Sequence, residues 1–424
     1  MARIAIVDSC FNWPPDGGAQ TDVRECAVRL ARDNNVKIFA ATMEDWLRVG
    51  SKRFRWPLDR TRFFWKGRIR EPVGVEIELV PFGPLSFSAK GIGPRFKSAI
   101  EAWKPDHVWI TQSWYLKPYL ALALKDFKPV VRIYAHEMLC IKADGFLYRW
   151  GKACEKDYLR DGALTHLRCD VCTLGFYVSY PSPTWLHEFF AARAFLPSYR
   201  ERVIESLHAS RVVLVYNRST ADRVSPFARE VRIVPGGVDV RRFTPRHSTN
   251  GGFEGKKVIL VPGRTEEKRK GFAVAVAAAE CLRRSRSDFE IWTTDSHFKG
   301  APGIRSIPWR SHSEMPDLYS QCDIVVIPSL WPEPFGMVTL EAMAAGLPVV
   351  ASRIGGLADI FEDGIEGYHF APGNADDLAE KLKLLLDDES KRVTMGISAR
   401  RRVEERHDWD DIVKQYVSPL FPEP

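Results

Sequence analysis

The chain has 424 residues, a length that favours two or three domains. Its hydrophobic fraction of 45% and charged fraction of 27% are those of globular proteins, which excludes a mainly disordered chain, a collagen-like fibre and a small disulfide scaffold. The net charge of +7 is modest, no apolar run is long enough to span a bilayer, and the first residues lack a signal-peptide core. We therefore expect a cytoplasmic protein whose eight cysteines are reduced or bind metal.

Apolar, β-branched runs alternate with helical patterns along most of the chain. The first half predicts a helix over 21–33 and buried strands at 3–8, 36–42, 75–82, 107–112, 129–136, 211–217 and 230–235. The second half predicts strands at 256–261, 288–294, 323–329, 348–352 and 368–372. Strands without polar alternation that are separated by helices indicate parallel sheets covered on both faces.

A polar stretch with Gly and Pro at 243–255 divides the two series. The sequence thus predicts an α/β protein with two doubly wound, Rossmann-like domains, 1–242 and 256–400. A helical segment, 401–424, is expected to pack back on the first domain. Ligands of such sheets bind beyond the carboxyl ends of the strands, so we expect the domains to face a cleft between them. Two insertions interrupt the first domain, at 46–70 and 137–180.

A glycine pair, Gly17 and Gly18, joins the first predicted strand to its helix. Glycines at this place allow backbone amides to approach an anion at the helix start, although a simple tight turn is an equally good explanation. The dinucleotide fingerprint Gly-x-Gly-x-x-Gly is absent, which argues against a nicotinamide enzyme.

The first insertion carries the basic character of the protein. Residues 46–70 hold nine Lys or Arg against Asp59 alone, a net charge of +8, interleaved with six Trp or Phe residues. Arg beside Trp and Phe suits an anionic membrane surface or a polyanionic acceptor. Nucleic acid is not expected, because no recognition module accompanies the charge. We expect this segment to place the protein at the inner face of the membrane as a peripheral contact.

The second insertion contains four cysteines within 33 residues: Cys140, Cys154, Cys169 and Cys172. Four thiolates can form a closed tetrahedral zinc site that would stabilise an irregular insertion. Buried thiols that pack as small hydrophobes are the alternative. A structural zinc ion is therefore a hypothesis of the sequence.

Two carboxylates in the second domain are separated by seven residues, in Glu333-Pro-Phe-Gly-Met-Val-Thr-Leu-Glu341. A strand ends just before this motif and a helix begins near Gly336, so backbone amides there can hold a phosphate. Two carboxylates beside a phosphate would repel it unless each carboxylate accepts hydrogen bonds from hydroxyl groups. A sugar on one side and a ribose on the other would supply such hydroxyl groups. A solvated loop Glu and a Glu favoured by the helix dipole are the alternatives.

Two basic residues, Arg264 and Lys270, leave the loop after the first strand of the second domain. Arg can hold a diphosphate as a bidentate fork and Lys as a compact charge. A solvated charge run is ordinarily the commoner explanation, but the position at a strand end favours a functional role.

Together these motifs resemble the retaining family-4 glycosyltransferases of GT-B fold. The resemblance implies that Glu333 contacts the donor sugar, that Glu341 binds the ribose hydroxyls, and that Arg264 and Lys270 hold the diphosphate. It also implies roles for a further set of groups: the backbone amides of Phe335, Gly336, Met337 and Val338 on sugar and phosphate, the loop of Gly17 and Gly18 on the diphosphate, and His136 beside the reacting sugar. One departure is Gly236, where the family usually has Asn.

The resemblance implies transfer of a sugar from a nucleotide diphosphate sugar to a glycan, lipid-linked or small-molecule acceptor, with retention of configuration and without a catalytic metal. The alternatives are a GT-B sugar-nucleotide epimerase and a non-catalytic sugar-nucleotide or polyanion-binding protein. A phosphorylase is disfavoured because no pyridoxal-phosphate lysine motif is present. A lone His at the end of a strand is more often structural, so the role of His136 depends on the resemblance alone.

Overall fold

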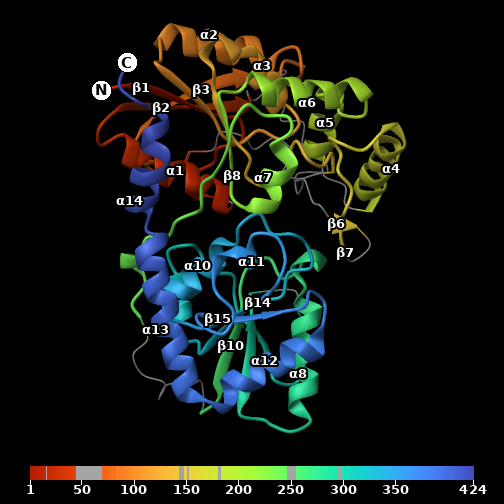
Figure 1. The fold of residues 1–424 in the computed structure, drawn as a ribbon, viewed down its shortest axis with the longest axis vertical. Helices are drawn as coiled ribbons and strands as arrows, with labels where there is room; N and C mark the ends of the chain where they lie inside the picture. Colours follow the sequence, from red (N-terminus) through yellow and green to blue (C-terminus); the bar gives the residue numbers. More distant parts are fainter. Residues whose placement is uncertain are drawn as a thin grey trace, which may run out of the picture. The chain divides into compact units, whose positions relative to one another are not determined.

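The computed structural model describes residues 1–15, 17–43, 69–83, 85–142, 148–149, 152–179, 183–245, 255–294, 298 and 300–424. Residues 46–68 of the basic segment lie outside these ranges, so its predicted membrane contact stays a prediction. The chain divides into two compact units (Figure 1). Unit 1 comprises Met1–Phe146, Glu155–Val234 and Val413–Pro424, and unit 2 comprises Leu147–Cys154 and Pro235–Ile412. The division after Val234 precedes the polar stretch where the sequence places the domain join.

Unit 1 is built on a seven-stranded parallel sheet with the order β3-β2-β1-β4-β5-β8-β9. Its strands are β1 (Arg3–Asp8), β2 (Asn35–Met43), β3 (Glu76–Phe82), β4 (His107–Ile110), β5 (Val130–Arg132), β8 (Val212–Val215) and β9 (Val231–Ile233). Its helices are α1 (Gly18–Leu30), α2 (Ile92–Trp103), α3 (Lys117–Ala123), α4 (Ala163–Ser179), α5 (Pro183–Ala191), α6 (Pro197–Ala209) and α7 (Arg218–Val224).

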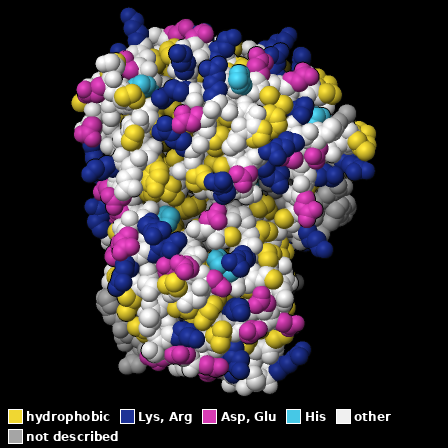
Figure 2. All heavy atoms as spheres, in the orientation of Figure 1, with side chains coloured by type: hydrophobic (Ala, Val, Ile, Leu, Met, Phe, Trp, Pro, Cys, Tyr) yellow, Lys and Arg dark blue, Asp and Glu magenta, His cyan; other side chains and the backbone are white. Residues whose placement is uncertain are grey.

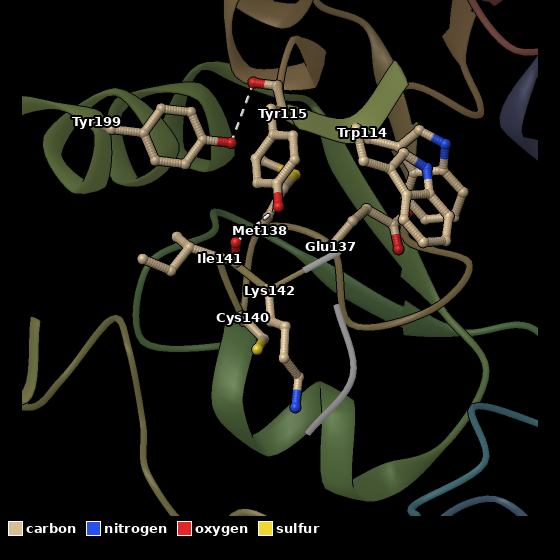
Figure 3. A pocket seen from close by; sticks show the side chains of 9 residues that line it. Trp114, Tyr115, Glu137, Met138, Cys140, Ile141, Lys142 and Tyr199 are labelled. Carbon is tan, nitrogen blue, oxygen red and sulfur yellow. Dashed lines mark hydrogen bonds between the residues drawn. The ribbon is translucent and has the colours of Figure 1, made fainter. Parts of the chain in front are cut away.

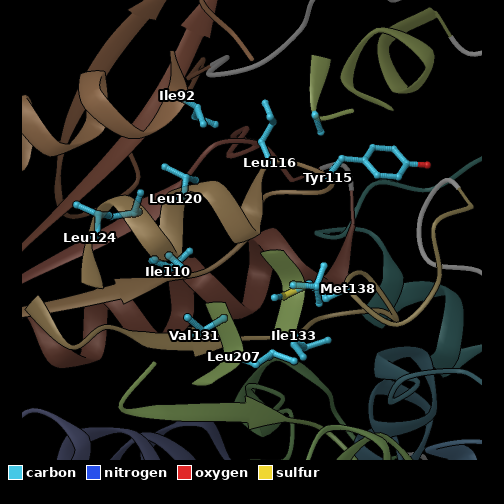
Figure 4. Close-up of a cluster of buried hydrophobic side chains, with 14 of the residues drawn as sticks. Ile92, Ile110, Tyr115, Leu116, Leu120, Leu124, Val131, Ile133, Met138 and Leu207 are labelled. Atoms are coloured by element: carbon cyan, nitrogen blue, oxygen red, sulfur yellow. The ribbon is translucent and has the colours of Figure 1, made fainter. Parts of the chain in front are cut away.

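The core of unit 1 lies between this sheet and its helices. Ile110 on β4 and Val131 on β5 are fully buried, and they belong to one hydrophobic cluster with Leu120 of α3 and Leu207 of α6 (Figure 4). Strands buried on both faces need apolar side chains at successive positions, which is the pattern that the sequence showed.

Unit 2 is built on a six-stranded parallel sheet with the order β12-β11-β10-β13-β14-β15. Its strands are β10 (Lys257–Val261), β11 (Phe289–Thr293), β12 (Ile304–Ser306), β13 (Ile324–Ile327), β14 (Val349–Ser352) and β15 (Gly367–Phe370). Its helices are α8 (Phe272–Arg283), α9 (Met315–Ser320), α10 (Met337–Ala344), α11 (Leu357–Ile360), α12 (Ala375–Asp387), α13 (Glu389–Arg406) and α14 (Trp409–Ile412). Of the strands of this sheet, only the short edge strand β12 was not predicted; a separate antiparallel pair, β6 (Tyr148–Arg149) and β7 (Lys152–Ala153), was not predicted either.

The strand orders confirm two doubly wound α/β sheets. In unit 1 the winding reverses between β1 and β4, and in unit 2 between β10 and β13. Such a reversal leaves a crevice at the carboxyl ends of the two neighbouring strands, where ligands of open α/β sheets bind. The loops after β10 and β13 therefore identify where the site of unit 2 should lie.

The C-terminal segment is divided between the units. Residues 401–412 belong to unit 2, and Val413–Pro424 belong to unit 1, where the carbonyl of Pro422 lies 2.7 Å from His107 Nε2. The part that follows Ile412 thus packs on the first unit. None of the helices within the described ranges is long and apolar enough to cross a membrane. On the face shown in Figure 2, basic and acidic side chains are interspersed.

Candidate functional site

Two loops of unit 2 meet at the reversal of its sheet. The loop after β10 ends in a short 3-10 turn, η4 (Lys268–Lys270), and Gly271 follows it with a φ of +73°. A Cβ atom at Gly271 would lie 1.8 Å from the carbonyl oxygen of Pro328, so only glycine allows the two loops to approach this closely. The amide of Leu330 also donates to the carbonyl of Arg269 at 2.8 Å, which joins the loops directly.

Glu333 is the anionic centre of this junction. Its side chain is buried, and Oε1 accepts hydrogen bonds from Lys270 Nζ at 2.7 Å and from Ser329 Oγ at 2.6 Å. Burial tends to raise the pKa of this carboxyl group. The charge and hydrogen bond of Lys270, together with the hydrogen bond of Ser329 and the charge of Arg269, outweigh burial and hold the pKa below its ordinary value of 4.5. Glu333 is therefore ionised at neutral pH, and the structure brings it together with Lys270.

Arg264 lies on the same loop, with its side chain 47% exposed and Nη1 3.8 Å from Glu267 Oε1. A guanidinium group this accessible can reorient towards a ligand at small energetic cost. The structure thus places both predicted basic residues on one loop at the edge of the crevice, with Lys270 paired to Glu333 and Arg264 turned towards its own loop.

Helix α10 begins directly after this loop. Gly336 adopts a φ of +107°, and a Cβ atom there would lie 2.5 Å from Leu357. Phe335, ahead of the helix, is buried. Met337 and Val338 form the first turn of the helix. Glycine has no side chain with which to cap the helix, so the amides of this turn remain suited to an anion.

Glu341 lies one turn into α10 and is 7% exposed. Its Oε2 accepts a hydrogen bond from the Tyr319 hydroxyl at 3.1 Å, and its Oε1 lies 3.3 Å from His312 Nε2. Burial and the neighbouring carboxylate raise the pKa of Tyr319 well above its usual value, so the phenol keeps its proton and donates it. Sequence reasoning missed Ser329, Tyr319 and His312. Of these three only Ser329, the last residue of a predicted strand, carried a local signal.

The departure at Gly236 has a packing explanation. A Cβ atom at Gly236 would lie 2.7 Å from the Phe335 ring and 2.9 Å from Met337 Sδ. The residue therefore packs directly against the start of α10, and the larger Asn of the family would displace this part of the motif.

Gly236 is also tied to His407, whose Nδ1 lies 3.1 Å from the Gly236 carbonyl and whose ring lies 6.0 Å from that of Phe335. Burial lowers the pKa of His407 to about 4, against 6.5 for the free side chain. Protonation of the buried imidazole therefore destabilises the folded protein. The free energy of unfolding should be highest above pH 6.5, and we expect it to fall by about 3 kcal/mol as the pH falls towards 4.

A histidine-to-glutamine pair tests this expectation. In His407→Gln, the drop of the thermal unfolding midpoint between pH 7 and pH 4.5 should be smaller than in the parent protein. His208→Gln, at an exposed position of unit 1, is the matched control and should leave the drop unchanged. Equal drops in the parent and His407→Gln proteins would contradict the assignment.

In unit 1, the glycine pair lies at the start of α1, as predicted. Gly17 precedes the helix in extended conformation and donates its N–H to Gln20 Oε1 at 2.9 Å, and Gly18 is the first helical residue. A Cβ atom at Gly17 would meet nothing within 4 Å, so neither packing nor backbone conformation requires glycine here. The predicted role of this loop on the diphosphate stays a prediction.

His136 does not end a strand, contrary to the prediction of a strand over 129–136. The strand stops at Arg132, because the Glu137 carboxylate turns the chain by accepting the amides of Tyr134 at 2.9 Å and Ala135 at 2.7 Å. Glu137 is itself held by buried Lys117 at 2.6 Å. His136 lies in this turn and is 3% exposed.

A small cavity, open to solvent, follows directly on this turn (Figure 3). It is lined mainly by aromatic and charged side chains: Trp114, Tyr115, Glu137, Met138, Cys140, Ile141, Lys142, Trp185 and Tyr199. Two loops beyond β4 and β5 contribute most of the lining. The cavity thus lies on the carboxyl side of the sheet of unit 1, and His136 is adjacent to it in the chain without lining it.

The four cysteines of the zinc hypothesis fall in different units. Cys140, Cys169 and Cys172 belong to unit 1, and Cys154 belongs to unit 2. Within the described ranges, which include all four, no group of three or more His, Cys, Asp or Glu side chains is arranged to hold a metal ion. The structure therefore gives the zinc site no support, and it stays a prediction.

Comparisons with known proteins found relatives of unit 2. Residues 298–402 match the family model described as "Glycosyl transferases group 1". The spore coat protein SA of Bacillus subtilis (strain 168) is 28% identical over 263 residues, which cover 55% of this chain and 70% of that protein. Further curated relatives are matched over only 26% to 52% of their own length.

Solved structures match over nearly the whole chain. Sucrose-phosphate synthase from Thermosynechococcus elongatus superposes with a TM-score of 0.69 at 18% identity, covering 99% of this chain and 98% of that one. Anabaena Alr3699/HepE, crystallised with UDP and glucose, gives a TM-score of 0.64 at 16% identity, with 99% of each chain covered. The chain has the GT-B fold, and its residues 298–402 are similar to the glycosyl transferases group 1 family.

Proposed function

We propose that the protein is a glycosyltransferase that moves a sugar from a nucleotide diphosphate sugar to an acceptor with retention of configuration. The observation that carries this proposal is the buried, ionised Glu333 with Lys270 2.7 Å away, at the sheet reversal of the unit that contains the family match. This pairing places an acceptor of sugar hydroxyls beside a cation for phosphate.

The charges of the site support separate roles for its basic and acidic residues in the transfer. Lys270, Arg264 and the first amides of α10 stabilise the negative charge that develops on the leaving diphosphate, so a catalytic metal ion is not expected. Glu333 has a lowered pKa and a cationic partner, which makes its carboxylate a weak base and a poor acceptor of a proton. A proton from the acceptor hydroxyl is then best received by the leaving phosphate itself, as in a retaining transfer.

The donor is proposed to be a UDP-hexose, because a protein of the same fold was crystallised with UDP and glucose. The acceptor is proposed to bind at unit 1, on the carboxyl side of its sheet, where Trp114 and Trp185 line a small cavity. The glycan, lipid-linked and small-molecule acceptors remain open to test. The epimerase and the non-catalytic binding protein are not favoured.

A thermal-shift panel of UDP-, GDP-, ADP- and TDP-sugars tests the proposal. A donor at a hundredfold excess over its dissociation constant should stabilise the protein by about 2.7 kcal/mol. We expect the UDP-sugars to give the largest shift and to be consumed slowly even without acceptor. A protein that none of these nucleotides stabilises would contradict the proposal.

A further inference from the structure

Within unit 2, a series of polar contacts runs from Arg242 through His312 to the carboxylate of Glu341. Arg242 closes the 3-10 turn η3 (Val240–Arg242), and its Nη1 lies 3.0 Å from His312 Nδ1. His312 lies in the turn ahead of α9, and its Nε2 lies 3.3 Å from Glu341 Oε1. Three segments far apart in the sequence thus converge on one side chain of α10.

Arg242 holds the ring of His312 in place. Its Nη1 lies 3.0 Å from Nδ1 and 3.5 Å from Nε2, so the guanidinium group contacts the ring beside both nitrogen atoms. The second arm of Arg242 donates to the His312 carbonyl at 2.8 Å, which fixes the turn as well as the ring. Nε2 of His312 is thereby kept 3.3 Å from the Glu341 carboxylate.

The opposite oxygen of Glu341 is also held. Tyr319, which is fully buried, donates its hydroxyl proton to Oε2 at 3.1 Å. Each carboxylate oxygen has a second lone pair, so one donor on each side orients the group and leaves it able to accept two further hydrogen bonds. The two adjacent hydroxyl groups of a ribose supply such a pair of donors.

We propose that His312, oriented by Arg242, is a positioning residue that fixes the Glu341 carboxylate for the ribose diol of the nucleotide. This inference rests on the proposed function, and it adds two residues that neither the family motif nor the sequence identified. His312 is 39% exposed at its side chain, whereas Glu341 is 9% exposed, so the imidazole lies at the solvent side of the carboxylate. A side chain in this position can be removed without opening the core.

The test compares UDP with its 2′,3′-dideoxy analogue, which lacks the ribose hydroxyl groups. Affinities are measured by calorimetry for the parent protein and for His312→Ala, Arg242→Ala and Arg241→Ala. Arg241 is the matched control, because this neighbouring arginine pairs with Asp239 and Asp410 instead. We expect His312→Ala and Arg242→Ala to lose about tenfold in affinity for UDP, equivalent to one hydrogen bond to a charged group. Affinity for the dideoxy analogue should not change.

A conservative variant distinguishes a positioning role of His312 from a merely structural one. The amide of Gln can place an N–H near the position of Nε2, so His312→Gln should recover most of the affinity for UDP. Equal losses for both nucleotides, or no loss for either, in His312→Ala would overturn the inference and leave the proposed function standing. A parent protein that binds neither UDP, GDP, ADP nor TDP would overturn the proposed function and this inference with it.

Discussion

Replacement of Lys270 by Ala is expected to weaken the binding of a nucleoside diphosphate by roughly 1.5–3 kcal/mol, the range of a charge-assisted hydrogen bond. The same change leaves the buried Glu333 carboxylate without the cation 2.7 Å from it. We therefore expect the pKa of Glu333 to rise and the thermal unfolding midpoint to fall, because an unpaired buried charge is costly. Calorimetry with UDP and thermal unfolding measure the two effects.

The other basic residue separates binding from stability. The Arg264 side chain is half exposed, and its contact with Glu267 is long, at 3.8 Å. Arg264→Ala should therefore weaken nucleotide binding to a similar degree without lowering the unfolding midpoint. Lys268→Ala, at an exposed position of the same loop, is the control and should change neither quantity. Unchanged affinity in both Lys270→Ala and Arg264→Ala would defeat the assignment of the diphosphate site.

The fold and the donor half of the site follow from patterns that are local in sequence. A parallel sheet places the ends of neighbouring strands side by side, so knowing that Arg264 and Glu333 each follow a strand was enough to bring their loops together. The same argument located Gly17 after β1. Knowing which strand each residue follows was thus enough to predict which loops meet, even though 63 positions separate Lys270 from Glu333.

What could not be predicted depends on contacts between segments that share no pattern. His312 lies in a polar turn like many others, and only the folded chain brings Arg242, 70 positions earlier, against it. The strand expected over 129–136 is cut short at Arg132 by the Glu137 carboxylate, although its apolar run continues beyond that point. Side-chain capping of this kind competes with the sheet and has no signature in hydrophobic periodicity.

The departure at Gly236 shows how a family motif can differ without loss of the site. The space that Asn would occupy is filled here by Phe335 and Met337, and the Gly236 carbonyl is held by His407. The position therefore serves the packing of α10 in this chain. A role for Asn at this point in other members of the family cannot be transferred to it.

The two carboxylates of the motif should respond differently to removal. Glu341→Ala is expected to weaken the binding of UDP and UDP-glucose alike, by about 1.5–3 kcal/mol, because both ligands carry the ribose that Glu341 is proposed to bind. Glu333→Gln is expected to weaken UDP-glucose by a similar amount, because a neutral amide is a weaker acceptor of the sugar hydroxyls than a carboxylate. Transfer should be reduced further than binding, since the charge of Glu333 acts most strongly at the reacting sugar.

The affinity of Glu333→Gln for free UDP distinguishes the two roles most clearly, because Glu333 and the diphosphate both bind Lys270. In the unliganded protein its ammonium group is bound to Glu333, and any diphosphate competes with that carboxylate for the same charge. Glu333→Gln removes the competitor, so the affinity for free UDP should stay equal or increase while the affinity for UDP-glucose falls. Glu362→Gln, at an exposed position of the same unit, is the control for the loss of one negative charge. Equal losses of UDP and UDP-glucose in Glu333→Gln would show that this residue acts on the nucleotide and not on the sugar.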